Sequence, residues 1–374
     1  MNPPSCSIGQ TYCVVSSMTE DKGILIKNIY YMLTYAFQVL RQSNYEEVAS
    51  EEFENIQDLF AAILAKGMAQ QLKQGLYREY SGKCEELTTL RGKLDLQGTI
   101  RNRLQRRQRL TCEYDELTEN NIYNQILKTT AVFLLQQPTV SPDHKKALKK
   151  VLLYLYGVDT LPPSGIQWSR ISFHKNNLNY RMLLNICYFV LAGLLLTTDK
   201  GRFRMAAFLD EQRMSRLYEK FVLEYYRYHY PNLGAAASRI SWNVDEDVSE
   251  FLPIMQTDIT LRHQKKILIL DTKYYTHTMQ YRSQYDSRKF HSENLYQIFA
   301  YVKNQDSSNT GNVAGMLLYA KTQETITPDC AFTIGRNKIS VKTLDLNTPF
   351  SGIVEQLDQI VESYFGIPVY TERK

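Results

Sequence analysis

Hydrophobic and polar residues alternate with two different periods along this chain. In its first half, apolar side chains recur every three or four positions, which is typical of amphipathic helices. This spacing predicts helices over residues 26–40, 55–72, 119–137 and 142–157. The most apolar run, 182–196, is shorter than the roughly 18 residues that a membrane span needs, so we expect it to form a buried helix.

A change of period marks residues 76–116. Polar and apolar positions alternate there and glycines stand at turn-like places, which predicts a small β-rich module. Farther along, a helix predicted over 213–230 ends before Pro231. Strand-like stretches follow at 255–262, 266–275, 313–320 and 331–336. Between the second and third of them we expect one more helix, over 292–304, with Ser292 as its N-cap. The expected fold is α/β (α+β overall), with a mixed central sheet flanked by helices.

The length of 374 residues favours two domains over a single core. We expect a loose leader over 1–22, a helical N-terminal domain over 23–200 that includes the β-rich module, and a second domain over 201–374. The net charge of +5 is compatible with a nucleic-acid partner. Within 101–109 the positive charge is concentrated in five arginines. Four of them, Arg101, Arg103, Arg106 and Arg107, are candidate contacts to DNA or to a protein partner; a solvated basic face is the alternative.

Several classes of protein are disfavoured by what the sequence lacks. Its six cysteines form no CxxC pair, and no secretory signal precedes them, so we expect reduced thiols and a cytoplasmic protein without a membrane partner. No GxxxxGK[ST] motif occurs, so this chain is expected to bind no nucleotide through a P-loop.

Two charged residues interrupt the end of an aliphatic strand in "KILILDTKYY", residues 266–275. If the preceding strand forms a hairpin that turns between Gln264 and Lys265, then Asp258 lies directly opposite Asp271. Side chains alternate along a strand, so Asp258, Asp271 and Lys273 share one face.

Carboxylates held directly opposite each other repel, and they lose hydration together. A divalent cation relieves this repulsion, and Mg²⁺ prefers such oxygen ligands while keeping several of its waters. The pattern therefore indicates a site for one or two Mg²⁺ ions in which Lys273 neutralises a phosphate or orients water. The alternative is an edge strand whose surface aspartates form salt bridges with Lys273.

These residues resemble the core of the PD-(D/E)xK nucleases, with Asp258, Asp271 and Lys273 at the acidic and lysine positions. The motif's proline is replaced by Thr257. More specifically, the chain resembles the McrC family, the nuclease subunits of McrBC restriction systems. The stretches that carry this resemblance are "IKNIYYMLTYAF", "MSRLYEKFVLEYY", "TDITLRHQKKILILDTKYY" and "KFHSENLYQIFAYV".

The resemblance implies further roles around the site. Gln297 and Tyr301 have the QxxxY spacing of RecB-like nucleases, where the glutamine orients the lysine or the DNA. Tyr301 is thus a candidate DNA contact; a solvated helix face is the alternative. The carbonyl of Thr272 would join Asp258 and Asp271 as a metal ligand. Glu219, on the helix before the sheet, is a further candidate ligand, with an ordinary surface glutamate as the alternative. The last helix of the motif follows two candidate phosphate contacts, Lys289 and His291.

The resemblance also implies partners. McrC proteins act with McrB, a separate AAA+ GTPase that forms rings and reads 5-methylcytosine in double-stranded DNA. By analogy, the N-terminal half of this chain would dock on such a ring, with the module at 76–116 inserted, and the second half would be the PD-(D/E)xK endonuclease domain. Two alternatives remain: a RecB-like repair nuclease that acts alone, and a GTPase-stimulating adaptor without catalysis.

Overall fold

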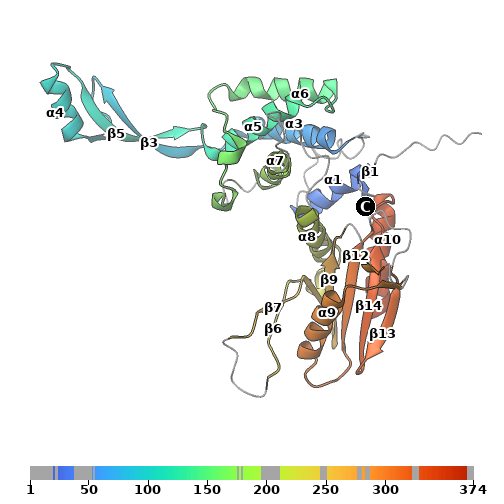
Figure 1. Ribbon diagram of the computed structural model, residues 1–374. Helices are drawn as coiled ribbons and strands as arrows, with labels where there is room; N and C mark the ends of the chain where they lie inside the picture. Colours follow the sequence, from blue (N-terminus) through green and yellow to red (C-terminus); the bar gives the residue numbers. More distant parts are fainter. Residues whose placement is uncertain are drawn as a thin grey trace, which may run out of the picture.

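The computed structural model describes residues 20–21, 24–37, 53, 55–174, 177, 180–194, 211–244, 251–275, 280–282, 287–321 and 328–368. A helical body, a long β finger that projects from it and an α/β domain make up this part of the chain (Figure 1). Most of the expected leader, and the expected domain boundary near residue 200, lie outside the described residues.

Four helices form the helical body: α3 (Ile56–Gln74), α5 (Ile122–Gln136), α6 (Pro142–Leu152) and α7 (Arg181–Leu194). Asn55, Asn121 and Ser141 cap three of them, because each side chain accepts a hydrogen bond from a backbone N–H of the first turn. The helices pack their apolar faces together, and α7 is buried as its composition predicts. Short 3₁₀ turns at Leu153–Leu155, Pro163–Gly165 and Trp168–Arg170 connect α6 to α7.

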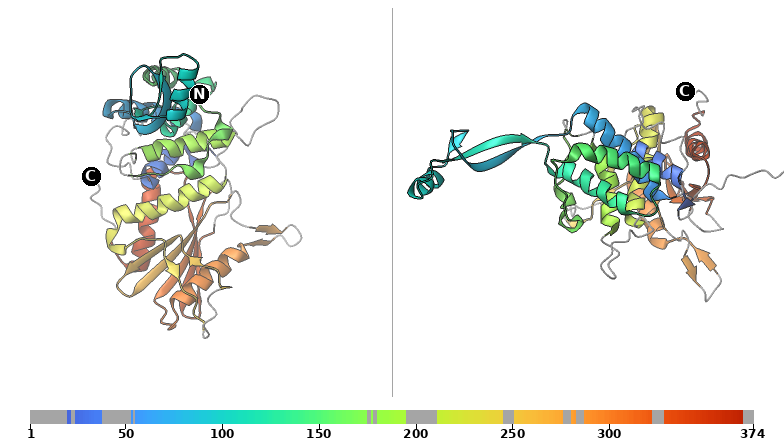
Figure 2. Two further views of the ribbon diagram at one scale, coloured as in Figure 1. Left: turned by 90° about the vertical axis from the view of Figure 1, so that its left-hand side faces the viewer. Right: turned by 90° about the horizontal axis from the view of Figure 1, so that it is seen from above.

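The β finger consists of strands β3 (Glu79–Leu87) and β5 (Leu110–Thr118), paired antiparallel from Glu79 opposite Thr118 to Leu87 opposite Leu110. A short strand, β4 (Lys93–Leu94), adds to β5 near the tip. The view from above shows how far the finger extends from the body (Figure 2). The tip also contains a helix, α4 (Leu96–Leu104), which the alternating pattern did not predict; Asp95 caps it by accepting from the N–H groups of Gln97 and Gly98.

The second half of the chain folds around a five-stranded sheet with the order β13–β14–β12–β9–β8. Its elements are α8 (Glu211–His229), β8 (Ile259–His263), β9 (Lys266–Lys273), α9 (Ser292–Gln305), β12 (Val313–Ala320), β13 (Cys330–Ile334), β14 (Asn337–Leu344) and α10 (Phe350–Phe365). The strand β12 runs parallel to β9 and β14, whereas β8 and β13 are antiparallel to their neighbours. The predicted mixed α/β fold is confirmed; β14 and α10 were not predicted.

Short strands complete the described structure: β1 (Glu20–Asp21) with β2 (Ile24–Leu25), β6 (Arg239–Ile240) with β7 (Met255–Gln256), and β10 (Gln280–Arg282) with β11 (Ser287–Lys289). A 3₁₀ turn at Pro231–Leu233 ends α8 at the predicted proline. Ser292 is the first residue of α9, whereas His291 is its N-cap and makes no side-chain capping bond, so the predicted cap is wrong by one residue.

The two faces of β9 are buried against different helices. Leu268 and Leu270 join the large core that contains α8 and α10, whereas Ile269 packs with Ile298 and Val302 of α9. Because side chains alternate along a strand, Asp271 and Lys273 belong to the α9 face, as Ile269 does. The sheet is therefore the middle layer between α8 and α10 on one side and α9 on the other (Figure 1).

The first helix, α1 (Ile26–Ala36), packs on the α/β domain. The side chain of Asn28 donates hydrogen bonds to the carbonyls of Leu346 and Thr348, at 2.8 and 2.7 Å. Tyr31 stacks on Phe350 of α10 with ring centroids 4.3 Å apart. The beginning of the chain thus contacts its far end, and it ties the α/β domain to the helical body. In the described part of the chain, no helix combines the length and apolar character that crossing a membrane requires.

Gly315 of β12 lets α9 approach the sheet closely. A methyl group at this position would lie 2.7 Å from Cγ1 of Ile298 and 2.8 Å from Cγ2 of Val302. We therefore expect Gly315→Ala to lower the free energy of unfolding by about 1–3 kcal/mol through overpacking. Thermal and urea unfolding measure this. Gly157→Ala is the control, because nothing lies within 4 Å of its added methyl group, and equal stability of the two variants would contradict the prediction.

Candidate functional site

The hairpin of β8 and β9 has the register that the sequence predicts. Ile259 pairs with Leu270 and His263 with Lys266, so the turn falls at Gln264 and Lys265. Asp258, one residue before β8, is held to β9 by two hydrogen bonds. Its Oδ2 accepts from the backbone N and the hydroxyl of Thr272, at 2.7 and 2.9 Å. These bonds fix the carboxylate beside the end of β9.

Asp271 is fully buried on the other strand, with 0% of its surface exposed. Its Oδ2 lies 2.8 Å from Nζ of Lys273, and its Oδ1 has no hydrogen-bond partner among the described residues. A buried carboxylate oxygen without a donor is costly, so its presence points to a group that the protein itself does not supply.

The charges around Asp271 resist its ionisation. Burial, and then the neighbouring Asp258 carboxylate, raise the pKa of Asp271 to about 6, although Lys273 opposes them. Burial disfavours the Lys273 ammonium too, but the Asp271 carboxylate outweighs that effect and raises the pKa of Lys273. Lys273 therefore remains charged, while the two carboxylates together need more positive charge than one lysine supplies.

Asp306, in the same domain, shows how a structural aspartate looks. It is also buried, but its oxygens accept from Thr310 N and Oγ1, Gly311 N and Asn337 Nδ2, at distances of 2.7–2.9 Å. In spite of burial, these donors lower the pKa of Asp306 to about 2. Asp271 lacks such donors, so nothing comparable offsets the effect of burial and of the Asp258 carboxylate on its pKa.

A chain of hydrogen bonds holds Lys273 from the α9 side. Its Nζ donates to Oε1 of Gln297 at 3.1 Å, and Nε2 of Gln297 donates to the hydroxyl of Tyr301 at 2.9 Å. Tyr301 in turn donates to the carbonyl of Gln256, just before Asp258, at 3.0 Å. The spacing of four residues puts Gln297 and Tyr301 on one face of α9. In the structure, Gln297 of the predicted QxxxY pair thus contacts the predicted lysine, and Tyr301 contacts Gln297.

Glu219 lies on α8 near the same charges, half-buried. Burial, and then the Asp258 and Asp271 carboxylates, raise the pKa of Glu219 to about 7, with Lys273 and Arg216 opposing. However, within the described residues, no three His, Cys, Asp or Glu side chains converge into a set that could hold a metal ion. Glu219 is therefore an electrostatic neighbour of the two aspartates, and its role as a metal ligand stays a prediction.

The remaining predicted residues lie apart from this cluster or at its edge. His291 begins α9, and its ring lies 5.0 Å from that of Tyr275, which follows β9. Lys289 ends β11, but its side chain lies outside the described part of the structure. The arginine candidates are all exposed at the finger tip, far from the sheet (Figure 1): Arg101 and Arg103 on α4, and Arg106 and Arg107 after it.

Sequence reasoning missed a second polar chain at the site. Asn294 of α9 donates to the hydroxyl of Tyr319 on β12 at 2.9 Å, and its Oδ1 accepts from Tyr275 at 3.4 Å. Desolvation raises the pKa of Tyr319, whose surroundings include Lys273 and Asp271. Asn294 stands in the "HSENLYQ" block, one turn before Gln297, so its place on the same helix face was the available signal.

The donor set fits a divalent cation held by few protein ligands. Asp258 and Asp271 are adjacent, and the charge requirement described above matches a hard cation with oxygen ligands. Mg²⁺ sites commonly use only one or two carboxylates, so these two aspartates are enough for such a site. The fold and the site thus define an α/β domain with paired carboxylates and an oriented lysine, joined to a helical body with a long finger.

Comparison with known proteins places this architecture. The chain belongs to the family of McrBC 5-methylcytosine restriction system components, whose family model matches residues 14–320. It is 29% identical over 352 residues to the type IV methyl-directed restriction enzyme EcoKMcrBC of Escherichia coli K12, covering 92% of this chain and 99% of that protein. The resemblance to McrC seen in the sequence is confirmed.

The fold is also similar to that of a solved assembly. The refined half-complex from the tetradecameric assembly of Thermococcus gammatolerans McrB AAA+ hexamers with bound McrC contains a chain that is 18% identical, with a TM-score of 0.50. The similarity covers 90% of this chain and 76% of that one. The likeness shows that most of this chain has a fold that also occurs in that assembly.

Neutralising Asp271 should stabilise the protein without divalent cations. Because its folded-state pKa is raised from 3.8 to about 6, the folded chain binds the proton more tightly, and stability falls as pH rises through that interval. Asp271→Asn removes this loss, so we expect its melting temperature to exceed that of the wild type at about pH 7 and to approach it at about pH 4. Thermal unfolding in EDTA at the two pH values measures the difference.

Asp306→Asn is the matched control, with the opposite sign. Its carboxylate has a lowered pKa and four donors, so its contribution is present above a pH of about 4 and is lost as pH falls toward 2. The asparagine variant should therefore melt lower than the wild type at about pH 7. If Asp271→Asn is also destabilising under these conditions, the Asp271 carboxylate is not strained by its surroundings.

Proposed function

We propose that this chain is the DNA-cleaving subunit of a modification-dependent restriction system and hydrolyses phosphodiester bonds with one or two Mg²⁺ ions. The observation that carries this proposal is the buried Asp271 carboxylate, with one oxygen free of donors, beside Asp258 and Lys273. Family membership supports the choice of DNA, because the family is described as part of a 5-methylcytosine restriction system.

Asp258 and Asp271 would hold the metal, together with the backbone carbonyl of Thr272. When bound, the ion would polarise the phosphate and lower the pKa of a water ligand, which makes hydrolysis possible near neutral pH. Lys273 binds a phosphate oxygen or the attacking water from the same face of the sheet. Gln297 holds the ammonium in place, and Tyr301 holds Gln297 through the hydrogen bonds described above.

This arrangement favours a catalytic site over the two alternatives of a surface ion pair and a relic site. A surface pair would leave its charges in water, whereas Asp271 is fully buried and Lys273 is largely so. A relic site would have no reason to keep the lysine aligned through a three-member hydrogen-bond chain. The QxxxY pair is also a feature of RecB-like nucleases. A nuclease that acts alone is therefore the alternative that the experiment below tests.

The partner in this proposal is an AAA+ GTPase ring like McrB. The Thermococcus assembly described above consists of McrB AAA+ hexamers with bound McrC, and a chain of that assembly is similar in fold to this chain. We propose that the β finger enters such a ring. Recognition of modified cytosine in double-stranded DNA would then belong to the partner.

The finger tip has the surface that such an insertion needs. Three apolar residues at a spacing of four lie exposed along α4: Leu96, Ile100 and Leu104, which are 65, 58 and 81% exposed. Apolar residues exposed in a row on one helix face mark a contact site for another protein. Arg101 and Arg103 flank this row, so the tip offers an apolar face with positively charged edges.

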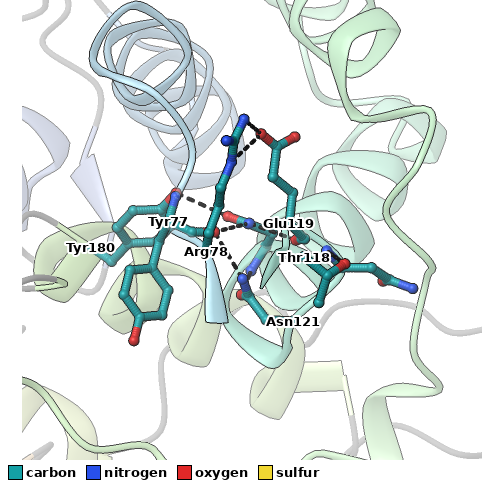
Figure 3. A network of polar contacts seen from close by, with 8 residues as sticks. Tyr77, Arg78, Thr118, Glu119, Asn121 and Tyr180 are labelled. Carbon is teal, nitrogen blue, oxygen red and sulfur yellow. Dashed lines mark hydrogen bonds and ion pairs between the residues drawn. The ribbon is translucent and has the colours of Figure 1, made fainter. Parts of the chain in front are cut away.

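The finger root is tied to the helical body by polar contacts (Figure 3). Asn121 and Asn124 donate to the carbonyl of Tyr77, and the hydroxyl of Tyr180 accepts from the N–H of Tyr77. Arg78, just before β3, forms an ion pair with Glu119, just after β5, at 2.6 Å. These contacts fix both strands where they leave the body.

Asp271→Ala and Lys273→Ala should abolish DNA cleavage and leave GTPase stimulation intact. Each removes a preorganised charge at the reacting phosphate, so we expect cleavage rates to fall at least about 100-fold. The assay uses methylated DNA, the GTPase partner, GTP and Mg²⁺. Lys338→Ala, exposed on β14, is the control and should cleave like the wild type.

The outcome separates the alternatives. Cleavage that persists in both variants would show that the site assignment is wrong. Strong cleavage of unmodified DNA by the wild-type chain without partner or GTP would favour the nuclease that acts alone. Cleavage that is absent even in the wild type, with GTPase stimulation present, would favour the adaptor.

Replacing both Ile100 and Leu104 with serine should weaken binding to the GTPase ring about 10-fold or more, because such buried anchors dominate interfaces. Both side chains are exposed, so the variant should keep the melting temperature of the wild type. Pull-down affinity and GTP turnover at a fixed partner concentration measure the effect. Tyr156→Ser is the control, because Tyr156 is an apolar residue that is 91% exposed away from the finger. Unchanged stimulation by the double variant would exclude the tip as the contact.

A further inference from the structure

A cavity lies between the helical body and helix α8 of the α/β domain. Its volume is about 300 Å³, at the lower end of the range for small-molecule sites. The walls come from the segment before α7, from α7 itself and from α8. Most of the lining side chains are aromatic or polar: Trp168, Ser169, Phe173, Asn185, Tyr188 and Arg216. The function proposed above makes no use of this cavity.

Trp168 gives the cavity both a flat apolar wall and a hydrogen-bond donor. Its ring packs edge-on against Tyr188, with centroids 5.0 Å apart. Its Nε1 is buried and has no hydrogen-bond partner among the described residues. A buried indole N–H normally finds an acceptor, so a ligand with an acceptor atom would satisfy it.

The charge at the cavity is positive. Arg216 of α8 lines it and is exposed, and Arg170, two residues after Trp168, is exposed as well. Together, an aromatic wall, an orphaned donor and an arginine at the rim suit a planar heteroaromatic ring that carries an anionic group. A nucleobase with its phosphate has this combination, because every base has a π face and acceptor atoms at its edge.

The cavity also lies beside the carboxylate site. Arg216 and Glu219 are three positions apart on α8, so they share one helix face. The charge of Arg216 acts on Glu219, which in turn is influenced by Asp258 and Asp271. A nucleotide held at Arg216 is therefore close to a strand whose phosphate lies at the two aspartates.

We propose that this cavity binds one unpaired nucleotide of the DNA strand, with its base against Trp168 and its phosphate on Arg216. The choice of a DNA strand over a free nucleotide rests on the proposed function. Binding of an extruded base would hold the strand in place beside the carboxylates, at a cost in unstacking that is lowest where the duplex is already distorted.

Trp168 itself reports on occupancy. The chain contains two tryptophans, Trp168 and Trp242, so a Trp242→Phe variant fluoresces from Trp168 alone. The probes are a fully paired duplex, the same duplex with one unpaired thymine, and the mononucleotide dTMP, all in EDTA. We expect the duplex with the unpaired base to quench Trp168 strongly, and the paired duplex and dTMP to quench it weakly.

Variants in the wild-type background test the contacts by fluorescence anisotropy of labelled DNA. Trp168→Ala should weaken binding of the duplex with the unpaired base by roughly 5- to 100-fold, because it removes the stacking surface. Trp168→Phe keeps a ring but loses the donor, so its effect should be roughly 2- to 10-fold. Arg216→Gln should weaken binding and reduce its salt dependence, whereas Arg336→Gln, an exposed arginine on the turn after β13, should do neither.

Each outcome decides the inference. A preference for the unpaired base that survives in both Trp168→Ala and Arg216→Gln would overturn it. Quenching by dTMP as strong as by DNA would assign the cavity to free nucleotides and overturn the choice of a strand. Because binding is measured without metal, quenching by DNA together with absent cleavage would reject the proposed function alone. Intact cleavage without quenching would reject this inference alone.

Discussion

The α/β domain is organised around one unfavourable contact: two carboxylates, Asp258 and Asp271, held side by side at the end of a buried strand. Neither is free to move away. The register of the β8–β9 hairpin places them opposite each other, and Thr272 donates two hydrogen bonds to Asp258. Both faces of β9 are covered by helices. The lysine that partly balances them is itself anchored by α9. The rigidity of the sheet therefore maintains an electrostatic strain that a divalent cation would relieve.

Much of this site could be predicted because strand geometry is regular. A polar turn between two aliphatic runs set the hairpin register, and the period of two then put Asp258, Asp271 and Lys273 on one face. The helical period did the same for Gln297 and Tyr301. The contacts that complete the site are different in kind. The bond from Tyr301 to the carbonyl of Gln256 and the link between Asn294 and Tyr319 join separate elements, so no local spacing encodes them.

The errors in the fold have similar physical causes. Helix α4 has only nine residues and lies inside a stretch of alternating pattern, so its one short row of apolar residues was too brief to reveal the helical period. Ser292 looks like an N-cap by residue type, yet the helix begins one residue earlier than that role requires. Glu219 lies near enough to the aspartates for their charges to raise its pKa, and the tertiary packing of α8, which no local spacing encodes, sets that position.

The shape of the finger has a mechanical consequence. It is a thin two-stranded ribbon anchored at one end, so a force applied to α4 acts on the root with a long moment arm. The resulting torque is borne by the few bonds around Tyr77, which include one from Tyr180, the residue just before α7. A bending load at the tip is thereby delivered to the beginnings of two helices, α5 and α7.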